Sequence, residues 1–214
     1  MTHPVWPLFD LRVRTPRLEL RYIDDNLATE LAQLAARGIH DPAFMPFMLP
    51  WTDEPSPQLE RSSMRWYWKG RAETSPARWH LMLAAIVDGI AIGMTSLDAN
   101  EFSTSREFES GSWLGREYQG RGLGKEMREA TLHLGFEGLG AEYATTSAWT
   151  DNGPSLGVTR SLGYEANGGR RAIRRGQPAD SLLFRMTRED WQRRLRRGDI
   201  TIDGLEPALP LLGL

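Results

Sequence analysis

Two apolar runs joined by a two-residue turn constrain the fold more than any other feature of the sequence. Residues 81–87 and 90–97 are both rich in aliphatic side chains, and Asp88-Gly89 stands between them. An Asp-Gly pair between two such runs is a strong signal for a β-hairpin, because both residues tolerate the backbone conformation of a tight turn. We therefore expect two antiparallel strands at this point of the chain.

Further elements are predicted on both sides of this hairpin from apolar spacing and capping residues. Strands are predicted at 18–21, 108–114, 143–149, 172–173 and 182–184, and helices at 27–37, 57–72, 123–139, 155–162 and from 188 onward. Trp66 and Trp68 of the second helix are expected to face the core. The order favours a single α/β (α+β) domain over residues 1–214, built on a central mixed, mostly antiparallel sheet flanked by helices. Its core would span about 15–190, with a C-terminal helix and tail at 187–214 that cross this subunit or a neighbour.

Composition limits the classes of function that fit the chain. Hydrophobic residues make up 40% and the net charge is −2, so the chain has no overall basic character for binding nucleic acid. The absence of cysteine excludes disulfides and a cysteine nucleophile, and no two of the four histidines have metal-ligand spacing. No apolar run approaches the roughly 20 residues that span a bilayer. We expect a cytoplasmic protein without a metal.

The segment 119–125, Gln-Gly-Arg-Gly-Leu-Gly-Lys, lies between a predicted strand and a predicted helix. Its three glycines allow a tight turn whose backbone approaches a ligand closely. The free N–H groups at the start of the helix suit a phosphate or diphosphate, and Arg121 and Lys125 add positive charge. A Walker loop is excluded because Glu126 follows Gly124-Lys125, where Ser or Thr is required. A dinucleotide fingerprint is excluded because Lys125 replaces its last glycine.

Four motifs in the same order resemble those of the GCN5-related N-acetyltransferase (GNAT) superfamily. The closer likeness is to the branch of the ribosomal-protein-alanine N-acetyltransferases, which are called RimJ/RimL-like. The matching segments are Thr-Pro-Arg-Leu-Glu-Leu-Arg at 15–21, Glu-Ser-Gly-Ser-Trp-Leu-Gly at 109–115, the glycine-rich segment at 118–126, and Asn152 and Ser155 followed by Leu-Gly-Tyr at 162–164.

The resemblance implies a sheet that is splayed between two central strands, with the pantetheine arm of an acyl-CoA in the gap. Acetyl-CoA or succinyl-CoA would be the co-substrate. The residues assigned to the coenzyme are Trp113, Leu114, Arg116, Gln119, Gly120, Arg121, Gly122, Leu123, Gly124, Lys125, Asn152, Ser155 and Arg160.

The reaction implied is acyl transfer to a primary amine, which must lose a proton before it attacks. Glu109 matches the family carboxylate and is the expected general base, with Glu107 as its substitute. Ser155, or alternatively Tyr164, would donate a proton to the leaving thiolate. An exposed strand carboxylate and a residue near a helix N-terminus would explain Glu109 and Ser155 equally well.

The acceptor amine is less constrained and would belong to a small molecule or a peptide. The proline-rich apolar segment 41–57 is expected either to seal the core or to form a wall of the acceptor site. Candidate substrate-binding residues are Met45, Phe47, Trp51, His80, Ser112 and Trp149. Ser110 and Ser112 stand where the family has bulky residues, so the acyl site is expected to be roomier, and Ser112, Arg106 and His80 are candidates for a succinyl carboxylate. A non-catalytic acyl-CoA sensor is the alternative function, and a homodimer or higher homo-oligomer is expected.

Overall fold

A nine-stranded sheet forms the centre of the computed structural model, which describes residues 3–214. Its strands, in spatial order, are β7 (Glu165–Arg174), β8 (Gln177–Thr187), β6 (Tyr143–Trp149), β5 (Glu107–Leu114), β4 (Ile90–Asn100), β3 (Arg78–Val87), β2 (Glu19–Tyr22), β1 (Arg12–Arg14) and β9 (Thr201–Asp203). Neighbouring strands run antiparallel except for β5 and β6, which run parallel. The sheet is therefore mixed and mostly antiparallel, as expected from the sequence.

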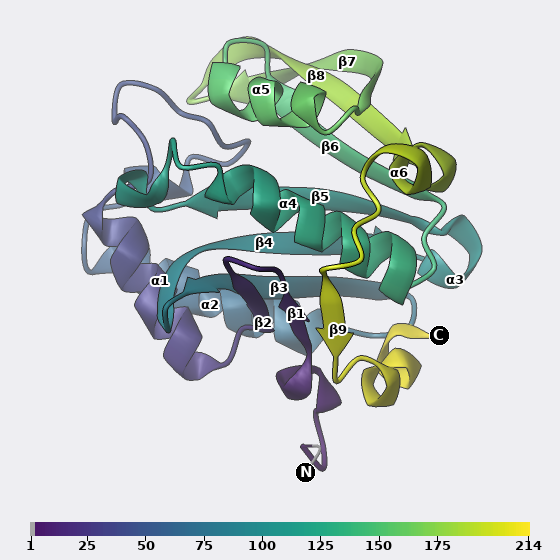
Figure 1. Cartoon of the computed structure of the whole chain (residues 1–214). Coiled ribbons are helices and arrows are strands. Elements are labelled where there is room, and N and C mark those ends of the chain that lie inside the picture. The colour runs from purple at the N-terminus through teal and green to yellow at the C-terminus, as the bar shows by residue number, and fades with distance from the viewer. Residues whose placement is uncertain (1–2) are drawn as a thin grey trace.

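Helices cover both faces of the sheet (Figure 1). The helices are α1 (Asp25–Arg37), α2 (Gln58–Glu73), α3 (Phe102–Ser105), α4 (Leu123–His133), α5 (Gly153–Ser161) and α6 (Arg188–Arg194). On β3, Leu81 and Leu83 pack in the cluster that contains α4, whereas Met82 and Ala84 pack in the cluster that contains α1 and α2. Because successive strand residues point to opposite faces, a strand covered on both sides is apolar throughout.

The predicted hairpin is confirmed. Asp88 and Gly89 have φ angles of 50° and 80°, and the β3–β4 ladder extends from Val87 opposite Ile90 to Arg78 opposite Asn100. The predicted strand at residues 143–149 is β6, with the same bounds. The two short strands predicted near the C-terminus are longer than expected and form the β7–β8 hairpin.

The two tryptophans of α2 do not face the core, so that prediction is wrong. Trp66 is 51% exposed and Trp68 is 49% exposed. The buried side of α2 consists of Leu59, Ser63, Tyr67 and Gly70. These four recur at helical spacing, which turns the flanking positions 66 and 68 toward the sides of the stripe.

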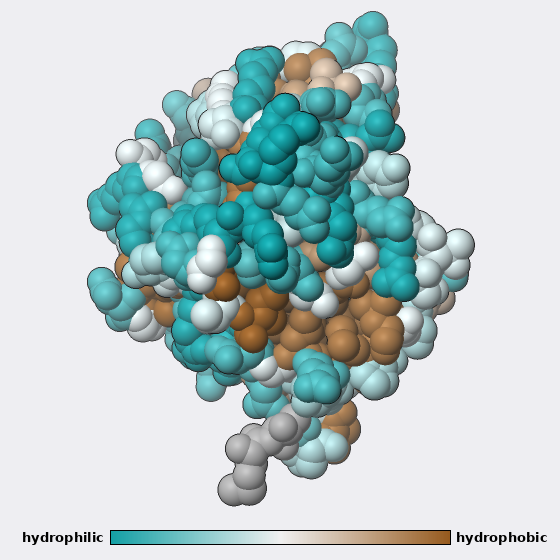
Figure 2. Space-filling model, turned by 45° about the vertical axis from the view of Figure 1, so that its right-hand side comes forward, coloured by the Kyte–Doolittle hydropathy of each residue, from teal (hydrophilic) through white to brown (hydrophobic). Residues whose placement is uncertain are grey.

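The C-terminal tail lies across this subunit. Strand β9 pairs with β1, with Ile202 opposite Val13, and the following 3₁₀ helix Glu206–Leu212 buries Ala208 and Leu212 completely. Figure 2 shows hydrophobic surface gathered in one patch on this side of the molecule, within a mainly hydrophilic surround. Within residues 3–214, no helix combines the length and the apolar character needed to cross a membrane.

Strands β5 and β6 stay paired over a short distance only. Their ladder contains three residue pairs and ends where Glu109 lies opposite Thr145. Strand β5 continues to Leu114 and β6 to Trp149 without further pairing between them. The sheet is therefore splayed between two central strands, as the family resemblance implied.

Candidate active site

A cleft of about 780 Å³ opens where β5 and β6 part. Its walls come from segment 39–48, the ends of β5 and β6 that are not paired with each other, the glycine-rich turn, α4 and α5. Gly115 donates its backbone N–H to Ile92 O at 2.9 Å, so odd-numbered residues at this end of β5 bond to β4. The backbone groups of Ser112 and Leu114 therefore face the gap, where β6 offers no ladder partner.

The glycine-rich turn has the conformation that its glycines permit. Gly120 and Gly122 have φ angles of 74° and 77°, which lie in the left-handed region. Helix α4 begins directly afterwards, and its first backbone bond runs from Glu126 N to Gly122 O at 3.2 Å. Among the residues that the structure describes, the N–H groups of 122–125 donate to no protein acceptor, as is usual for a helix start. These amides offer a site for an anion.

Gln119 anchors this turn to the rest of the fold. Its Nε2 atom donates to Leu114 O at 2.9 Å and to Ile39 O at 2.7 Å. Arg116 N donates to Gly38 O at 3.1 Å. The turn is thus tied both to the end of β5 and to the segment that leaves α1, and Gln119 also lines the cleft.

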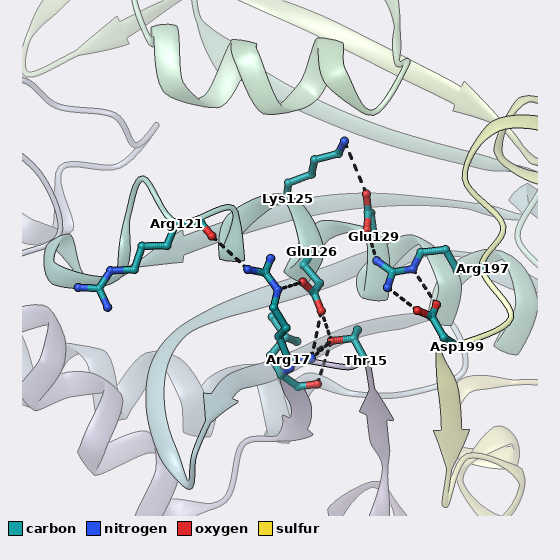
Figure 3. Close-up of polar contacts among 9 residues, drawn as sticks. Thr15, Arg17, Arg121, Lys125, Glu126, Glu129, Arg197 and Asp199 are labelled. Carbon is teal, nitrogen blue, oxygen red and sulfur yellow. Dashed lines mark hydrogen bonds and ion pairs between the residues drawn. The ribbon is translucent and has the colours of Figure 1, made fainter.

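A second set of bonds holds the turn from its other side (Figure 3). The Glu126 carboxylate, on a residue 6% exposed, accepts hydrogen bonds from Thr15 Oγ1 at 2.6 Å and from Arg17 Nε at 2.5 Å. Arg17 Nη1 also donates to Arg121 O at 3.2 Å. Burial alone would raise the pKa of Glu126, but the hydrogen bonds from Thr15 and Arg17 outweigh it and lower that pKa.

This clamp gives two of the sequence motifs a structural role that sequence reasoning missed. Thr15 and Arg17 belong to the first motif, and Glu126 ends the glycine-rich motif. The signal that could have found this contact was the presence of both motifs in one chain, because they lie far apart in the sequence. Together they fix the turn between β5 and α4.

A row of polar side chains crosses the sheet at the opposite end of the cleft. The ladders place His80 opposite Asp98, Asp98 opposite Glu109, and Glu109 opposite Thr145. Residues opposite one another share a face, with Cβ atoms about 5 Å apart. His80 Nδ1 is hydrogen-bonded to Asp98, and Ser147 Oγ donates to Glu109 Oε1 at 3.4 Å. Asp98 and Glu109 both line the cleft, which makes this end acidic.

The candidate acceptor residues divide between the cleft and the core. Phe47 and Ser112 line the cleft. Met45 is 2% exposed and Trp149 is 1% exposed, with Trp149 Nε1 donating to Phe47 O at 3.1 Å. Trp51 packs on Phe47 at a ring separation of 5.3 Å. Segment 41–57 therefore both seals the core and contributes a wall of the cleft.

Of the three candidates for a succinyl carboxylate, His80 and Arg106 lie apart from Ser112. His80 lines a small separate cavity beside α2 instead of the cleft. Arg106 lies with its guanidinium 5.8 Å from the centre of the Phe102 ring and also lies outside the cleft walls. Glu107 is exposed and is not part of the cleft either.

The candidates on and beside α5 differ in their access to the cleft. Asn152 caps α5 by accepting from Ser155 N at 3.3 Å, and both residues line the cleft. Tyr164 is 6% exposed, and its hydroxyl lies 3.5 Å from Ser110 Oγ at the point where the strands part. Arg160 is exposed outside the walls. Of the coenzyme candidates, Arg121 and Leu123 also lie outside the walls, whereas the remainder line the cleft.

The sequence predictions did not include the buried arginine of the cleft. Arg128 of α4 lines the cleft, yet it is only 7% exposed. Its Nη1 donates to Thr159 Oγ1 at 2.7 Å, and its guanidinium lies 5.4 Å from the centre of the Tyr164 ring. An arginine on the apolar side of a predicted helix, between Met127 and Ala130, was the signal that could have found it.

The part of the chain that the structure describes shows no evident site for a metal ion. Within residues 3–214, no group of three or more histidine, aspartate or glutamate side chains is arranged to hold a metal ion.

Comparison with known proteins gives a family match. A sequence model described as acetyltransferase (GNAT) domain matches residues 17–165, which is more than half of the chain. Among solved structures, a RimL ribosomal L7/L12 α-N-protein acetyltransferase in complex with coenzyme A is similar, at 18% identity and a TM-score of 0.69, covering 81% of this chain and 95% of that one. A GCN5-related N-acetyltransferase from Brucella melitensis has 19% identity and a TM-score of 0.67, covering 85% of this chain and 80% of that one.

A GNAT-family acetyltransferase from Bacillus anthracis has 16% identity and a TM-score of 0.66, covering 83% of this chain and 99% of that one. At these identities, the structural likenesses establish the fold. The sequence model, the splayed sheet and the glycine-rich turn agree with one another. The chain belongs to the GNAT acetyltransferase family.

Proposed function

We propose that the chain transfers an acyl group from acyl-CoA to a primary amine by direct attack within the cleft between β5 and β6. The observation that carries this proposal is the turn at 119–125, where four backbone N–H groups of residues 122–125 lie beside the cleft with no acceptor in the described chain. A diphosphate satisfies such amides and is favoured by the helix N-terminus. The pantetheine arm would then follow the backbone groups of Ser112 toward Glu109, because the Leu114 carbonyl already accepts a hydrogen bond from Gln119.

The charges of the cleft support this orientation. Arg116 and Lys125 line the end near the glycine-rich turn, and Asp98 and Glu109 line the other end. A polyanionic coenzyme and a cationic amine are attracted to opposite ends of such a cleft. The two reactants would meet where the strands part.

Deprotonation of the acceptor is the first demand on the enzyme. A lysine-like amine with a pKa of about 10.4 must spend about 4.6 kcal/mol to be neutral at pH 7, whereas an N-terminal amine with a pKa near 8 needs far less. We assign Glu109 as the general base, because it is exposed within the cleft at the acidic end. Asp98, its cross-strand neighbour, would hold the incoming ammonium ion.

The remaining steps use groups on both sides of the gap. As the amine nitrogen bonds to the thioester carbon, the carbonyl oxygen becomes negative and the Leu114 N–H would stabilise it. The C–S bond then breaks, and the departing sulfur takes a proton from Ser155, which lines the cleft. The nitrogen releases its extra proton as the amide forms, and this proton restores the serine hydroxyl. Tyr164 remains the alternative donor.

A pair of glycine variants tests the coenzyme site. Gly122→Glu places a carboxylate beside the free amides, at a residue whose φ angle is 77°. Gly176→Glu is the matched control, because Gly176 has a φ angle of 76° but lies in the distant β7–β8 turn. Calorimetry with acetyl-CoA should show lost binding for Gly122→Glu alone, whereas equal binding in both variants would remove this site.

Turnover separates an enzyme from a sensor. Release of free coenzyme A thiol should rise when peptides, polyamines or other amines are added. Tight acyl-CoA binding without stimulation by any amine would favour the non-catalytic sensor instead.

We also propose that the chain forms one catalytic domain that assembles into a homo-oligomer. The pairing of β9 with β1 joins the tail to the same sheet, which supports one domain. Two features support an assembly surface: the hydrophobic patch that Figure 2 shows, and the side chain of Trp66 on α2, which is 51% exposed. Light scattering after size-exclusion chromatography measures the mass directly, and a monomer at all concentrations would contradict the assembly.

A further inference from the structure

We infer that Arg128 binds a carboxylate at the end of the acyl chain, so that the preferred donor is the CoA thioester of a dicarboxylic acid, such as a malonyl, succinyl or glutaryl thioester. This inference rests on the proposed function. It starts from one unusual feature of the cleft: a buried positive charge that faces it.

Arg128 is buried without full compensation. It is 7% exposed and lines the cleft, and its Nη2 atom has no hydrogen-bond partner in the described structure. Among the described residues, its guanidinium donates one hydrogen bond, from Nη1 to the uncharged Thr159 Oγ1 at 2.7 Å. A buried cation is costly unless an anion or several acceptors satisfy it. The free nitrogen therefore points to an anionic or strongly accepting ligand in the cleft.

The acidic residues beside Arg128 on α4 are engaged elsewhere. Glu126 is bonded to Thr15 and Arg17. Glu129 pairs with Arg197 at 2.6 Å and lies 3.9 Å from Lys125 Nζ (Figure 3). Neither carboxylate is available to neutralise Arg128, so the counter-charge would arrive with the substrate.

The place of Arg128 along α4 determines which part of a bound acyl-CoA can contact its guanidinium. Helix α4 runs back along β5: a Cβ on Gly124 would lie 3.5 Å from Leu114, and Gly135 lies against Phe108. Arg128 falls between these two points, about one helical turn beyond the glycine-rich turn. Its guanidinium lies over Tyr164, whose hydroxyl is 3.5 Å from Ser110 Oγ, at the point where the strands part.

The other anionic groups of an acyl-CoA do not fit this place. The diphosphate is assigned to the amides of 122–125 at the start of α4. The 3′-phosphate is attached to the ribose, which lies on the far side of the diphosphate from the pantetheine arm. An acyl chain projects past the sulfur into the parting of the strands, and a carboxylate at its end can reach the buried guanidinium. An acetyl group has no such charge.

Donor kinetics test this assignment with acetyl-CoA as the internal reference. We expect the protein to use at least one of malonyl-, succinyl- and glutaryl-CoA with a kcat/KM about 10-fold or more above that for acetyl-CoA. Loss of one partner of a buried charged pair should lower kcat/KM for that donor by about 30-fold or more in Arg128→Gln. The value for acetyl-CoA should change by less than about 3-fold, and Arg128→Lys should recover part of the carboxyacyl activity.

The outcomes that overturn the inference are distinct from those that overturn the proposed function. Equal losses for acetyl-CoA and the carboxyacyl-CoAs in Arg128→Gln would assign Arg128 to the pantetheine arm or to folding, and a preference of the parent protein for acetyl-CoA would have the same effect. Thermal unfolding of Arg128→Met, which keeps the volume but not the charge, detects a folding defect. Failure of every acyl-CoA to bind would instead overturn the proposed function along with the inference.

Discussion

The hydroxyl of Thr15 donates a hydrogen bond of 2.6 Å to Oε1 of Glu126, although the two residues are 111 positions apart in the chain. With Arg17, this contact joins the turn before β2 to the first turn of α4. The glycine-rich turn is therefore held by a buried carboxylate on one side and by Gln119 on the other.

Glu126→Gln is expected to weaken the clamp, because the amide cannot accept two charge-assisted bonds as the carboxylate does. We expect a loss of about 1–3 kcal/mol in the free energy of unfolding, measured with urea. The KM for acyl-CoA should rise, whereas kcat should change little. Glu165→Gln, on an exposed strand residue, is the control. An unchanged KM would show that the clamp serves stability alone.

The same carboxylate gives a pH dependence with a defined sign. The pKa of Glu126 is lowered from its ordinary value of 4.5 in the folded protein. Its contribution to stability is therefore complete above about 4.5 and is lost as the pH falls through the lower folded pKa. Between about pH 3 and pH 7, the free energy of unfolding should therefore change less with pH in Glu126→Gln than in the parent protein. Parallel curves for the two proteins would contradict this assignment.

Glu109→Gln should slow the chemical step. We expect kcat to fall by about 100-fold or more at neutral pH, with a small change in the KM for acyl-CoA. Glu107→Gln is the matched control, because Glu107 is exposed on the same strand with the same alternation but lies outside the cleft. Comparable losses in the two variants would argue against Glu109 as the base.

Gln119→Leu should loosen the turn without removing any charge. The variant leaves the carbonyl oxygens of Ile39 and Leu114 without their shared donor. We expect the Kd for acyl-CoA to rise by about 10-fold, which corresponds to about 1.4 kcal/mol. Gln177→Leu, at an exposed strand end, should leave the Kd unchanged. Calorimetry measures both, and an unaltered Kd in Gln119→Leu would count against the anchoring role.

Local patterns in the sequence predicted the parts of this fold that depend on near neighbours. The Asp88-Gly89 turn and the strand at 143–149 follow from backbone preference and alternation, and both are confirmed. The orientation of Trp66 was not recoverable, because it depends on which stripe of α2 the sheet covers. The burial of Met45 and Trp149 likewise depends on a loop that folds over β6.

The candidate site shows the same division. The glycine-rich turn and Glu109 could be located from motifs that lie within a few residues of each other. The clamp at Glu126 and the free nitrogen of Arg128 are properties of contacts between distant segments. A sequence states that an arginine lies on an apolar helix face, but only the folded chain shows whether a carboxylate meets it.

The three-pair ladder between β5 and β6 also has a mechanical consequence. The block β6–β8–β7 is attached to the other six strands of the sheet through very little hydrogen bonding of its own. A substrate bound in the gap would contact both groups of strands and so limit their movement relative to each other. Amide hydrogen exchange along β6 and β8 should then be slower when substrate is bound than when the cleft is empty. The enzyme would therefore be most rigid when it is ready to react.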